Sequence, residues 1–300
     1  MPTNFTIKEL QGSITINPSS STPTFNGTNS NTITFGGSST NAVRMRAQIH
    51  NAEGIDSEMH LDVWNLPLSV MNQLSTYGTL LNQLPKNQII LQGGDTNGWS
   101  QLYTGSIISS TMDMQQPESV LRMTAQASAA FAATPGKPTS FNGSAQVADV
   151  MQSIAAQMGL QFENNGVTGA LSNTYLYGSP RDQFRTVVGH ADIGATIENG
   201  ILAIWPKFKN RSGGAIQISP TNNTMFDYPA FTATGVALRA PFNPGFAIGK
   251  QVTVSGSQIT AVNATWNIYM VSHLLEVQMP GGKWESELLA SNQNAPSPIA

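Results

Sequence analysis

Short alternating segments, separated by clusters of Gly, Asn, Ser and Pro, occupy both ends of this 300-residue chain and constrain its fold more than any other feature. Such spacing is typical of antiparallel sandwiches and barrels. In the first part it predicts strands at 33–35, 43–49, 59–64, 88–91, 101–109 and 120–127. The polar segment 22–31 is expected to be an exposed loop.

A short helix is expected to interrupt these strands. Pro67 suits the first position of a helix, and Leu68, Met71 and Leu74 follow it at helical spacing. The sequence therefore predicts that these three side chains share one buried face.

The middle of the chain has the period of helices. One predicted helix has Ser144 as its N-cap and Gly159 as its stop. Its apolar face is formed by Val147, Val150, Met151, Ile154 and Met158. A second helix is predicted to begin at Ser179 and Pro180, where Ser179 would be the N-cap and Pro180 the first helical residue. Its expected inner face is Phe184, Val187 and Val188.

A hairpin is expected after each of these helices. Asn164-Asn165-Gly166 supplies a turn after the first helix, and Asn199-Gly200 supplies a stronger turn signal after the second. The middle of the chain therefore reads as a duplicated unit of one helix and one hairpin.

Strand-like alternation returns after residue 207. Tyr269, Val271, Leu275 and Val277 are expected to share one face of a long strand, and Ser272 and Glu276 the other. Predicted strands are 215–219, 234–240, 250–256, 267–278 and, after a Gly281-Gly282 turn, 283–291. A faint repeat at an offset of about 165 residues aligns Trp99 and its following strands with Trp266 and the strands after it.

The expected architecture is therefore mainly β with an α+β insert, in which two tube-like barrel or sandwich domains flank a small helix-hairpin-helix-hairpin domain. The segment around 133–141 contains two prolines and a glycine and is expected to be a linker. The predicted domains are 1–132, 142–206 and 207–290, followed by a flexible tail at 291–300.

Low charge excludes several classes of function. The chain has 14 Lys+Arg and 17 Asp+Glu, a net charge of -3 and only 10% charged residues, against about 25% in ordinary domains. Such a surface gains little from counterion release, so contact with DNA is expected to be non-specific only. Without cysteine, disulfides, thiolate catalysis and iron–sulfur clusters are excluded. Neither a signal peptide nor an apolar membrane anchor is expected.

Motifs for catalysis or cofactor binding are not found. His50, His60, His190 and His273 lack the spacing of metal ligands, although His50 and Asp62 would face each other if their strands formed a hairpin. His273 lies in the most regular strand and is expected to pack or bond a neighbour. Nucleophile elbows and phosphate loops are absent as well. No catalytic, cofactor-binding or metal-ligating residue is therefore assigned, and no cofactor is expected.

Two groups of carboxylates are candidates for a hydrolase site, which needs a pair at a fixed separation. Exposed like charges explain both groups better than a catalytic pair does. These residues are Glu53, Asp56, Glu58 and Asp62 in one group and Glu285 and Glu287 in the other.

Lys207, Lys209 and Arg211 form the one basic cluster, and strand alternation would place all three on one face. A contact with phosphates or with a partner stays open, but a solvated strand edge is the favoured interpretation. Trp64, Trp99 and Trp284 leave a carbohydrate-binding adhesin as the alternative function, ahead of a cell-wall hydrolase.

Long stretches of the chain resemble the baseplate hub proteins of contractile-tailed bacteriophages, the group that includes late control protein D. The stretches that carry the resemblance are AQVADVMQSIAAQMGLQFENNG, YLYGSPRDQFRTVVGHADIGATIENGILAIWPK, GVALRAPFNPGFAIGKQVTVSG and NIYMVSHLLEVQMPGGKWES, together with LDVWNLPLSVMNQL and LYTGSI near the start.

This resemblance implies a structural protein of the virion baseplate, assembled in the host cytoplasm and without enzymatic activity. It implies a homotrimer whose two tube-like domains per subunit form a pseudo-sixfold ring. That ring would join a hexameric tail tube to a trimeric central spike, contact wedge proteins of the baseplate and give a conduit for DNA ejection.

Overall fold

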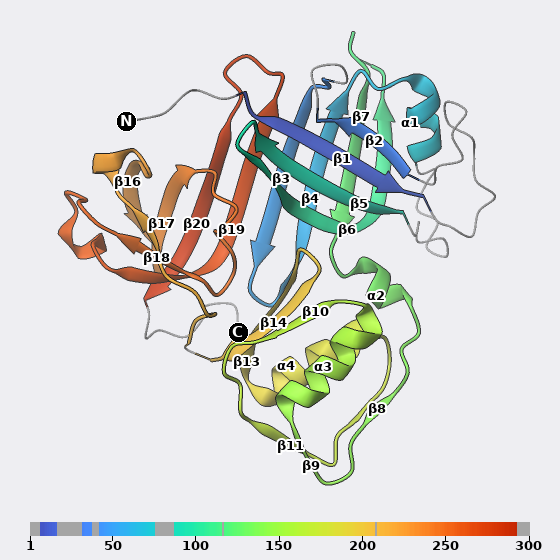
Figure 1. Ribbon diagram of the computed structural model, residues 1–300, viewed down its shortest axis with the longest axis vertical. Helices are drawn as coiled ribbons and strands as arrows, with labels where there is room; N and C mark the ends of the chain where they lie inside the picture. Colours follow the sequence, from blue (N-terminus) through green and yellow to red (C-terminus); the bar gives the residue numbers. More distant parts are fainter. Residues whose placement is uncertain are drawn as a thin grey trace. The chain divides into compact units, whose positions relative to one another are not determined.

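The computed structural model describes residues 7–16, 32–37, 42–75, 87–115, 117–207 and 209–292 (Figure 1). The segment 22–31 and most of the predicted tail lie outside these residues. The chain is mainly β, with 51% strand and 17% helix, as expected. It divides into two compact units. Unit 1 comprises Met1–Ile49, Glu58–Ala130 and Leu274–Trp284, and unit 2 comprises His50–Ser57, Phe131–His273 and Glu285–Ala300.

The first set of strands forms an antiparallel sheet in the order β3-β4-β7-β6-β5-β1-β2. Its members are β1 (Glu9–Thr15), β2 (Thr32–Gly36), β3 (Met45–Ala52), β4 (Ile55–Trp64), β5 (Gln88–Asp95), β6 (Gly98–Asp113) and β7 (Val120–Gln126). Each of the six segments predicted as strands in this part coincides with one of them. Alternate residues of β1 are buried, as period-two patterning requires.

The predicted short helix is α1 (Leu68–Leu74), but one of its three face residues was assigned wrongly. Met71 and Leu74 are buried together with Val70, whereas Leu68 is 52% exposed. Leu68 and Leu74 are six residues apart, so their side chains point in directions that differ by roughly 120° around the helix axis. Leu68 therefore lies at the edge of the face on which Met71 and Leu74 are central.

The middle segment contains two helices of twelve residues, α3 (Val147–Met158) and α4 (Pro180–Ala191). Before them lies a short helix, α2 (Ala129–Ala133), at the point where the chain passes from unit 1 to unit 2. The accompanying strands are β8 (Thr139–Ser140), β9 (Ser144–Gln146), β10 (Gln161–Asn164), β11 (Ala170–Ser172), β12 (Tyr175–Leu176), β13 (Ile193–Glu198) and β14 (Ile201–Pro206).

The apolar spacing of α3 predicted its buried face correctly, since all five predicted residues are buried. Gly159 ends the helix in the left-handed conformation at φ 68°. The prediction of Ser144 as the N-cap is wrong. Ser144 lies in β9, where it pairs with Ser172, and Gln146 precedes the helix without a side-chain cap.

Helix α4 begins as predicted, because Ser179 and Asp182 form a reciprocal capping box and Pro180 is the first helical residue. Its inner face is more polar than expected. Val187 is fully buried, but Phe184 and Val188 are half-buried. The fully buried Gln183 lies beside Val187, and its amide bonds the hydroxyl of Thr139 at 2.7 Å.

Only one of the two predicted hairpins in the middle segment forms. Asn199 and Gly200, both with positive φ, connect the antiparallel strands β13 and β14. The hairpin predicted at Asn164-Asn165-Gly166 is wrong, because β10 pairs in parallel with β14 and β11 pairs with β9. The Asn164 carboxamide accepts a bond from the backbone N–H of Val167, and this local turn ends β10. The middle segment is therefore not a duplicated helix-hairpin unit.

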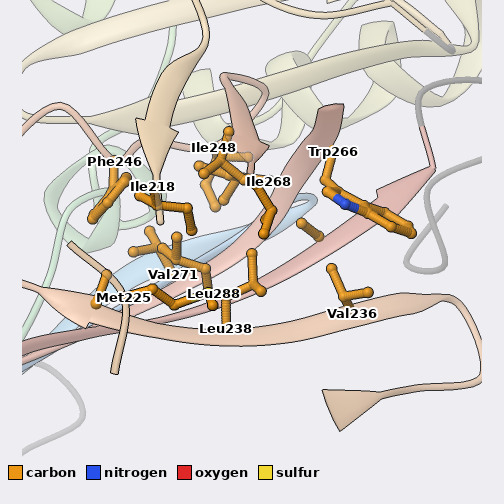
Figure 2. Packing of buried hydrophobic residues seen from close by; sticks show 14 of the residues in the cluster. Ile218, Met225, Val236, Leu238, Phe246, Ile248, Trp266, Ile268, Val271 and Leu288 are labelled. Atoms are coloured by element: carbon orange, nitrogen blue, oxygen red, sulfur yellow. The ribbon is translucent and has the colours of Figure 1, made fainter. Parts of the chain in front are cut away.

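The second set of strands has the order β16-β17-β20-β19, with β18 on β19 and β15 on β18. Its members are β15 (Ile216–Ile218), β16 (Phe226–Phe231), β17 (Gly235–Pro241), β18 (Gln251–Val254), β19 (Thr265–Val277) and β20 (Trp284–Asn292). The predicted apolar face of β19 is buried, and Ser272 and Glu276 on its other face are only partly buried. Figure 2 shows the core of this part, in which Leu238, Ile268 and Leu288 lie together.

The same five-strand order occurs twice in the chain. Strands β3-β4-β7-β6-β5 are matched by β16-β17-β20-β19-β18, and each set runs through the chain as a hairpin followed by three strands. The backbone N–H of Ile107 donates to the carbonyl of Asn87, just before β5. In the same way, the backbone N–H of Ile268 donates to the carbonyl of Lys250, just before β18. The repeat seen in the sequence therefore falls on equivalent strands.

The tryptophans that suggested the repeat are not equivalent to each other. Trp99 is 42% exposed at the start of β6, whereas Trp266 is 8% exposed and its indole N–H bonds the carbonyl of Val262 at 2.9 Å. The alignment by tryptophan was therefore wrong in register, and Ile107 and Ile268 mark the structural correspondence.

A glycine in β13 permits the close packing of Trp205. Gly194 is the cross-strand partner of Trp205, and a methyl group added at Gly194 would overlap the indole ring. Gly194→Ala is expected to lower the free energy of unfolding by about 1–3 kcal/mol through overpacking. Urea denaturation followed by circular dichroism measures this change. Gly189→Ala is the matched control, since nothing lies within 4 Å of its added methyl. Equal stability of both variants would contradict the account of this contact.

Candidate functional site

The four histidines lie in different surroundings. The Nδ1 atom of His50 is 2.9 Å from the hydroxyl of Ser272, and His60 contacts Glu58 at 2.9 Å. His190 lies in the last turn of α4. Among the described residues, no group of three or more His, Asp or Glu is placed to hold a metal ion, and His50 and Asp62 are not brought into one.

His273 is buried, as the regularity of its strand suggested. Its Nδ1 atom is 2.8 Å from the hydroxyl of Ser286, and its ring meets that of Phe242 edge-on at 5.1 Å. Burial, with a smaller contribution from His50, lowers the pKa of His273 to about 4. The imidazole is therefore neutral at physiological pH.

Several of the carboxylates that were expected to be exposed like charges are paired with cations. Asp56, whose side chain is 15% exposed, contacts Arg181 and lies 3.6 Å from Arg185. Glu285 contacts Arg239 at 2.9 Å. Half-burial raises the pKa of Asp62, although three basic side chains around it act in the opposite direction. The interpretation as simple exposed charges is therefore wrong for Asp56 and Glu285.

The predicted basic face does not form. Strand β14 ends at Pro206, so alternation does not continue through the three cations. Lys207 contacts Asp192 at 2.5 Å, and Lys209 is exposed. Arg211 is a buried residue with a side chain only 4% exposed. The interpretation of this cluster as a solvated strand edge is therefore wrong for Arg211.

Arg211 is the centre of a buried ionic cluster. Its guanidinium forms two bonds to Glu163 at 3.0 and 3.2 Å and also contacts Glu198 and the carbonyl of Ile248. Its backbone N–H donates to the carbonyl of Gly249 at 2.8 Å. The cluster therefore connects β10 and β13 of the middle segment to the loop before β18.

The two carboxylates of the cluster respond differently to their surroundings. The bond from Arg211 lowers the pKa of Glu163. Burial raises the pKa of Glu198, even though Arg211 acts against this effect. Arg211 therefore favours the charged form of Glu198, which burial without a counterion would strongly disfavour.

Arg181 and Arg185 provide a second ionic link inside unit 2. Both lie on α4, and both reach Asp56 near the start of β4. The middle segment is thus tied by ion pairs to the second strand set through Arg211 and to the segment His50–Ser57 through Asp56. These links hold the middle segment against the second strand set and against the segment His50–Ser57.

Among the described residues, exposed aromatic side chains gather on β16 and in and directly after β12. Phe226, Tyr228 and Phe231 of β16 are 39%, 67% and 57% exposed, and Tyr175 and Tyr177 are 65% and 75% exposed. The sequence analysis assigns no strand to 226–231, and Pro229 in FDYPAF is unfavourable in a strand other than an edge strand. The spacing of its aromatic residues was the signal that could have found it.

Two of the three tryptophans considered for carbohydrate binding, Trp64 and Trp284, are partly covered by other residues. The guanidinium of Arg44 covers the ring of Trp64 at 4.6 Å from its centroid. Trp284 is half-buried with its ring against Gly93. Of the three, Trp99 is the most exposed residue.

Two open hollows lie in unit 2. One, of about 330 Å³, is lined by residues around Thr168 and His190, and the other, of about 320 Å³, by residues around Tyr228 and Gln258. Within the described part of the chain, no helix is long and apolar enough to cross a membrane.

Comparison with known proteins gives one family and a consistent fold. A family model described as "Baseplate hub gp41" matches residues 32–278. No curated protein matches the chain.

Two similar solved structures are tail proteins. The tail protein from Neisseria meningitidis MC58 is 9% identical with a TM-score of 0.60, over 97% of this chain and 99% of that one. The 43 kDa tail protein of prophage MuSo2 from Shewanella oneidensis is also 9% identical, with a TM-score of 0.58 over 95% and 98% of the two chains.

A third similar structure comes from a secretion machine. The E. coli c3393 protein is described as a type VI secretion component with structural similarity to the T4 tail proteins gp27 and gp5. It is 9% identical with a TM-score of 0.55, over 86% of this chain and 77% of that one. At these identities the three structures establish a shared fold.

Proposed function

This chain belongs to the baseplate hub gp41 family, and from that premise we propose that three copies form the hub ring of a phage tail baseplate. The ring joins a hexameric tail tube to a trimeric central spike and meets wedge proteins of the baseplate. Its place is the virion, after assembly in the host cytoplasm.

The repeated five-strand order is the observation that carries this proposal. A closed ring of identical subunits has a symmetry equal to the number of its copies. Two related sheets per chain give a trimer six similar modules, so that it can match a sixfold partner on one side and a threefold partner on the other.

Composition supports a conduit for DNA. With 10% charged residues and a net charge of -3, the chain has few cations to neutralise phosphates. A wall that binds DNA through many Lys and Arg would hold it in a salt-dependent manner. A ring built from this chain lets DNA pass with weak, non-specific contacts.

The role is structural, without catalytic turnover. The buried pair of Arg211 with Glu198 and the partly buried pair of Asp56 with Arg181 serve packing between segments. The domains 1–132, 142–206 and 207–290 correspond in this proposal to a first ring module, a connecting insert and a second ring module.

The mass of the purified protein in solution tests the proposal. Light scattering coupled to size exclusion is expected to give three times the 32.0 kDa of the chain. The chain's wide use of Asn, Gln, Ser and Thr suits polar interfaces that also contain bridging water. A monomer at every concentration tested, together with absence of the protein from purified tails, would contradict the proposal.

A further inference from the structure

A hollow of about 320 Å³ opens beside the start of β16 in unit 2. Its walls come from the short turn Pro220–Asn222, from the chain that enters β16 and from the loop that follows β18. Ligand pockets span about 300–1,000 Å³, so the hollow has the size for one small ligand. The lining side chains that decide its chemistry are those of Pro220, Thr221, Met225, Asp227, Tyr228 and Gln258.

The backbone of β16 is irregular where it borders the hollow. Asp227 lies in the left-handed region at φ 52°, and the pairing register with β17 shifts between Phe226 and Ala230. In a regular strand the consecutive residues Asp227 and Tyr228 would point to opposite faces. Here both line the same hollow. Bulges that re-aim side chains in this way, and backbone strain, are concentrated at functional sites.

Hydrogen-bond donors and acceptors meet at the hollow. The hydroxyl of Tyr228 donates to the Oε1 atom of Gln258 at 3.2 Å. Among the described residues, the amide nitrogen of Gln258 has no partner, so its two N–H donors are available to a ligand. The carboxylate of Asp227 supplies acceptors, and the hydroxyl of Thr221 can both donate and accept.

The charges around the hollow favour a neutral ligand. Of the described residues that line it, none is Lys, Arg or His, so an anionic ligand would find no cation there. Its described lining contains one carboxylate, that of Asp227, which is already 2.6 Å from the guanidinium of Arg239. A cationic ligand would have to compete with this arginine.

Part of the lining is apolar. Tyr228 is 67% exposed, and the apolar side chains of Pro220 and Met225 also border the hollow. A tyrosine side chain combines an apolar ring with a polar hydroxyl. A sugar has a similar combination, because its ring presents C–H groups on a face and hydroxyls, each a donor and an acceptor, around the rim. The lining therefore fits a neutral saccharide better than a phosphate or a basic peptide.

We propose that this hollow is a binding site for a neutral saccharide. The ring of Tyr228 packs against the C–H face of one sugar unit, and the carboxylate of Asp227 and the amide of Gln258 bond its hydroxyls. This inference goes beyond the hub role and is independent of it, because the whole site lies within one chain.

Binding of the natural protein to an array of neutral mono- and oligosaccharides, each also titrated in solution, tests the inference. At least one sugar is expected to bind, and the free monosaccharide is expected to compete because the hollow holds a small ligand. Tyr228→Ala is expected to weaken this binding about tenfold, since the sugar loses the ring against which it packs. Phe231→Ala is the matched control with unchanged binding, because it removes an exposed ring of the same strand that does not line the hollow.

Further variants test the polar part of the site. Tyr228→Phe keeps the ring but loses the bond to Gln258, so it is expected to weaken binding less than Tyr228→Ala does. Gln258→Glu replaces the amide donors by a second carboxylate and is expected to weaken binding about tenfold. Trp99→Ala is expected to bind as the natural protein does, because Trp99 does not line the hollow. Since Tyr228 and Gln258 are exposed, these variants are expected to keep the natural circular dichroism spectrum.

Several results would overturn the inference: no binding of any sugar on the array, no competition by the free monosaccharide, or equal binding by Tyr228→Ala and the natural protein. An equal loss in Phe231→Ala and Tyr228→Ala would also do so, because it would indicate a broad aromatic surface instead of a site in the hollow. Light scattering on the same samples reports the oligomeric state. A trimer that binds no sugar leaves the proposed hub intact, whereas a monomer that binds sugar removes the hub ring alone, so the failures of the two proposals are distinguishable.

Discussion

Alanine at Arg211 is expected to lower the free energy of unfolding by roughly 3–5 kcal/mol, the usual loss when one partner of a buried ion pair is removed. The side chains of Arg211 and Glu198 are 4% and 7% exposed. Without the guanidinium, Glu198 keeps its burial and loses its counterion. Urea denaturation of Arg211→Ala and the natural protein measures the difference.

Two further variants separate the ionic effect from general damage. Arg239→Ala removes an arginine that also contacts two carboxylates, but its side chain is 43% exposed. Exposed pairs contribute about 1 kcal/mol or less. Arg211→Met combined with Glu198→Leu is expected to recover part of the loss, because an apolar pair leaves no buried charge at Glu198. A loss for Arg211→Ala no larger than that for Arg239→Ala would refute the role of the cluster.

Acid is expected to destabilise the protein through His273. Burial lowers its pKa from 6.5 to about 4 in the folded state, so the unfolded chain binds a proton that the folded chain does not. Stability is therefore lost as the pH falls through 6.5 toward 4. The full effect is about 3 kcal/mol, at about 1.36 kcal/mol per pKa unit. Denaturation midpoints measured between pH 7 and pH 4 report it.

The difference between variants isolates this histidine from the other titrating groups. His273→Gln keeps a polar partner for Ser286 but does not titrate, so its stability should fall less steeply between pH 6.5 and pH 4. Val271→Ala, on the same buried face of β19, should lower stability by a similar amount at every pH. Parallel pH profiles for the natural protein and His273→Gln would show that His273 does not cause the acid sensitivity.

Local patterns predicted local structure well. The apolar spacing of α3, the Ser179 cap with Pro180 at the start of α4 and the Asn199-Gly200 turn depend on residues close in sequence, and all three are present. The alternation in β19 also predicted its buried face, because a strand with one buried face has a period of two.

Predictions that depended on distant partners failed. Nothing near Asn164 in the sequence indicates that β10 will pair with β14 in parallel. Nothing near Arg211 in the sequence indicates that Glu163 and Glu198 will surround it, so the sequence predicts an exposed basic side chain there. Strand β16 was not predicted at all, and its Pro229 is a residue that strands accept mainly at a sheet edge, where β16 lies.

The repeat was partly predictable. Its strands could be matched by sequence because both sets alternate in the same way. Its register could not, because tryptophan at positions 99 and 266 has different roles in the two sets. The equivalent backbone bonds of Ile107 and Ile268 become visible only when the strands are paired.

The symmetry of the intact tail tip, seen by cryo-electron microscopy, tests the central claim most directly. The account predicts a ring of three copies that lies directly between a sixfold tube and a threefold spike. In this ring the first and second sheets of the copies alternate, which gives six similar sheets. A single copy at the tip, a ring of six copies, or density for this chain away from the tube axis would contradict it.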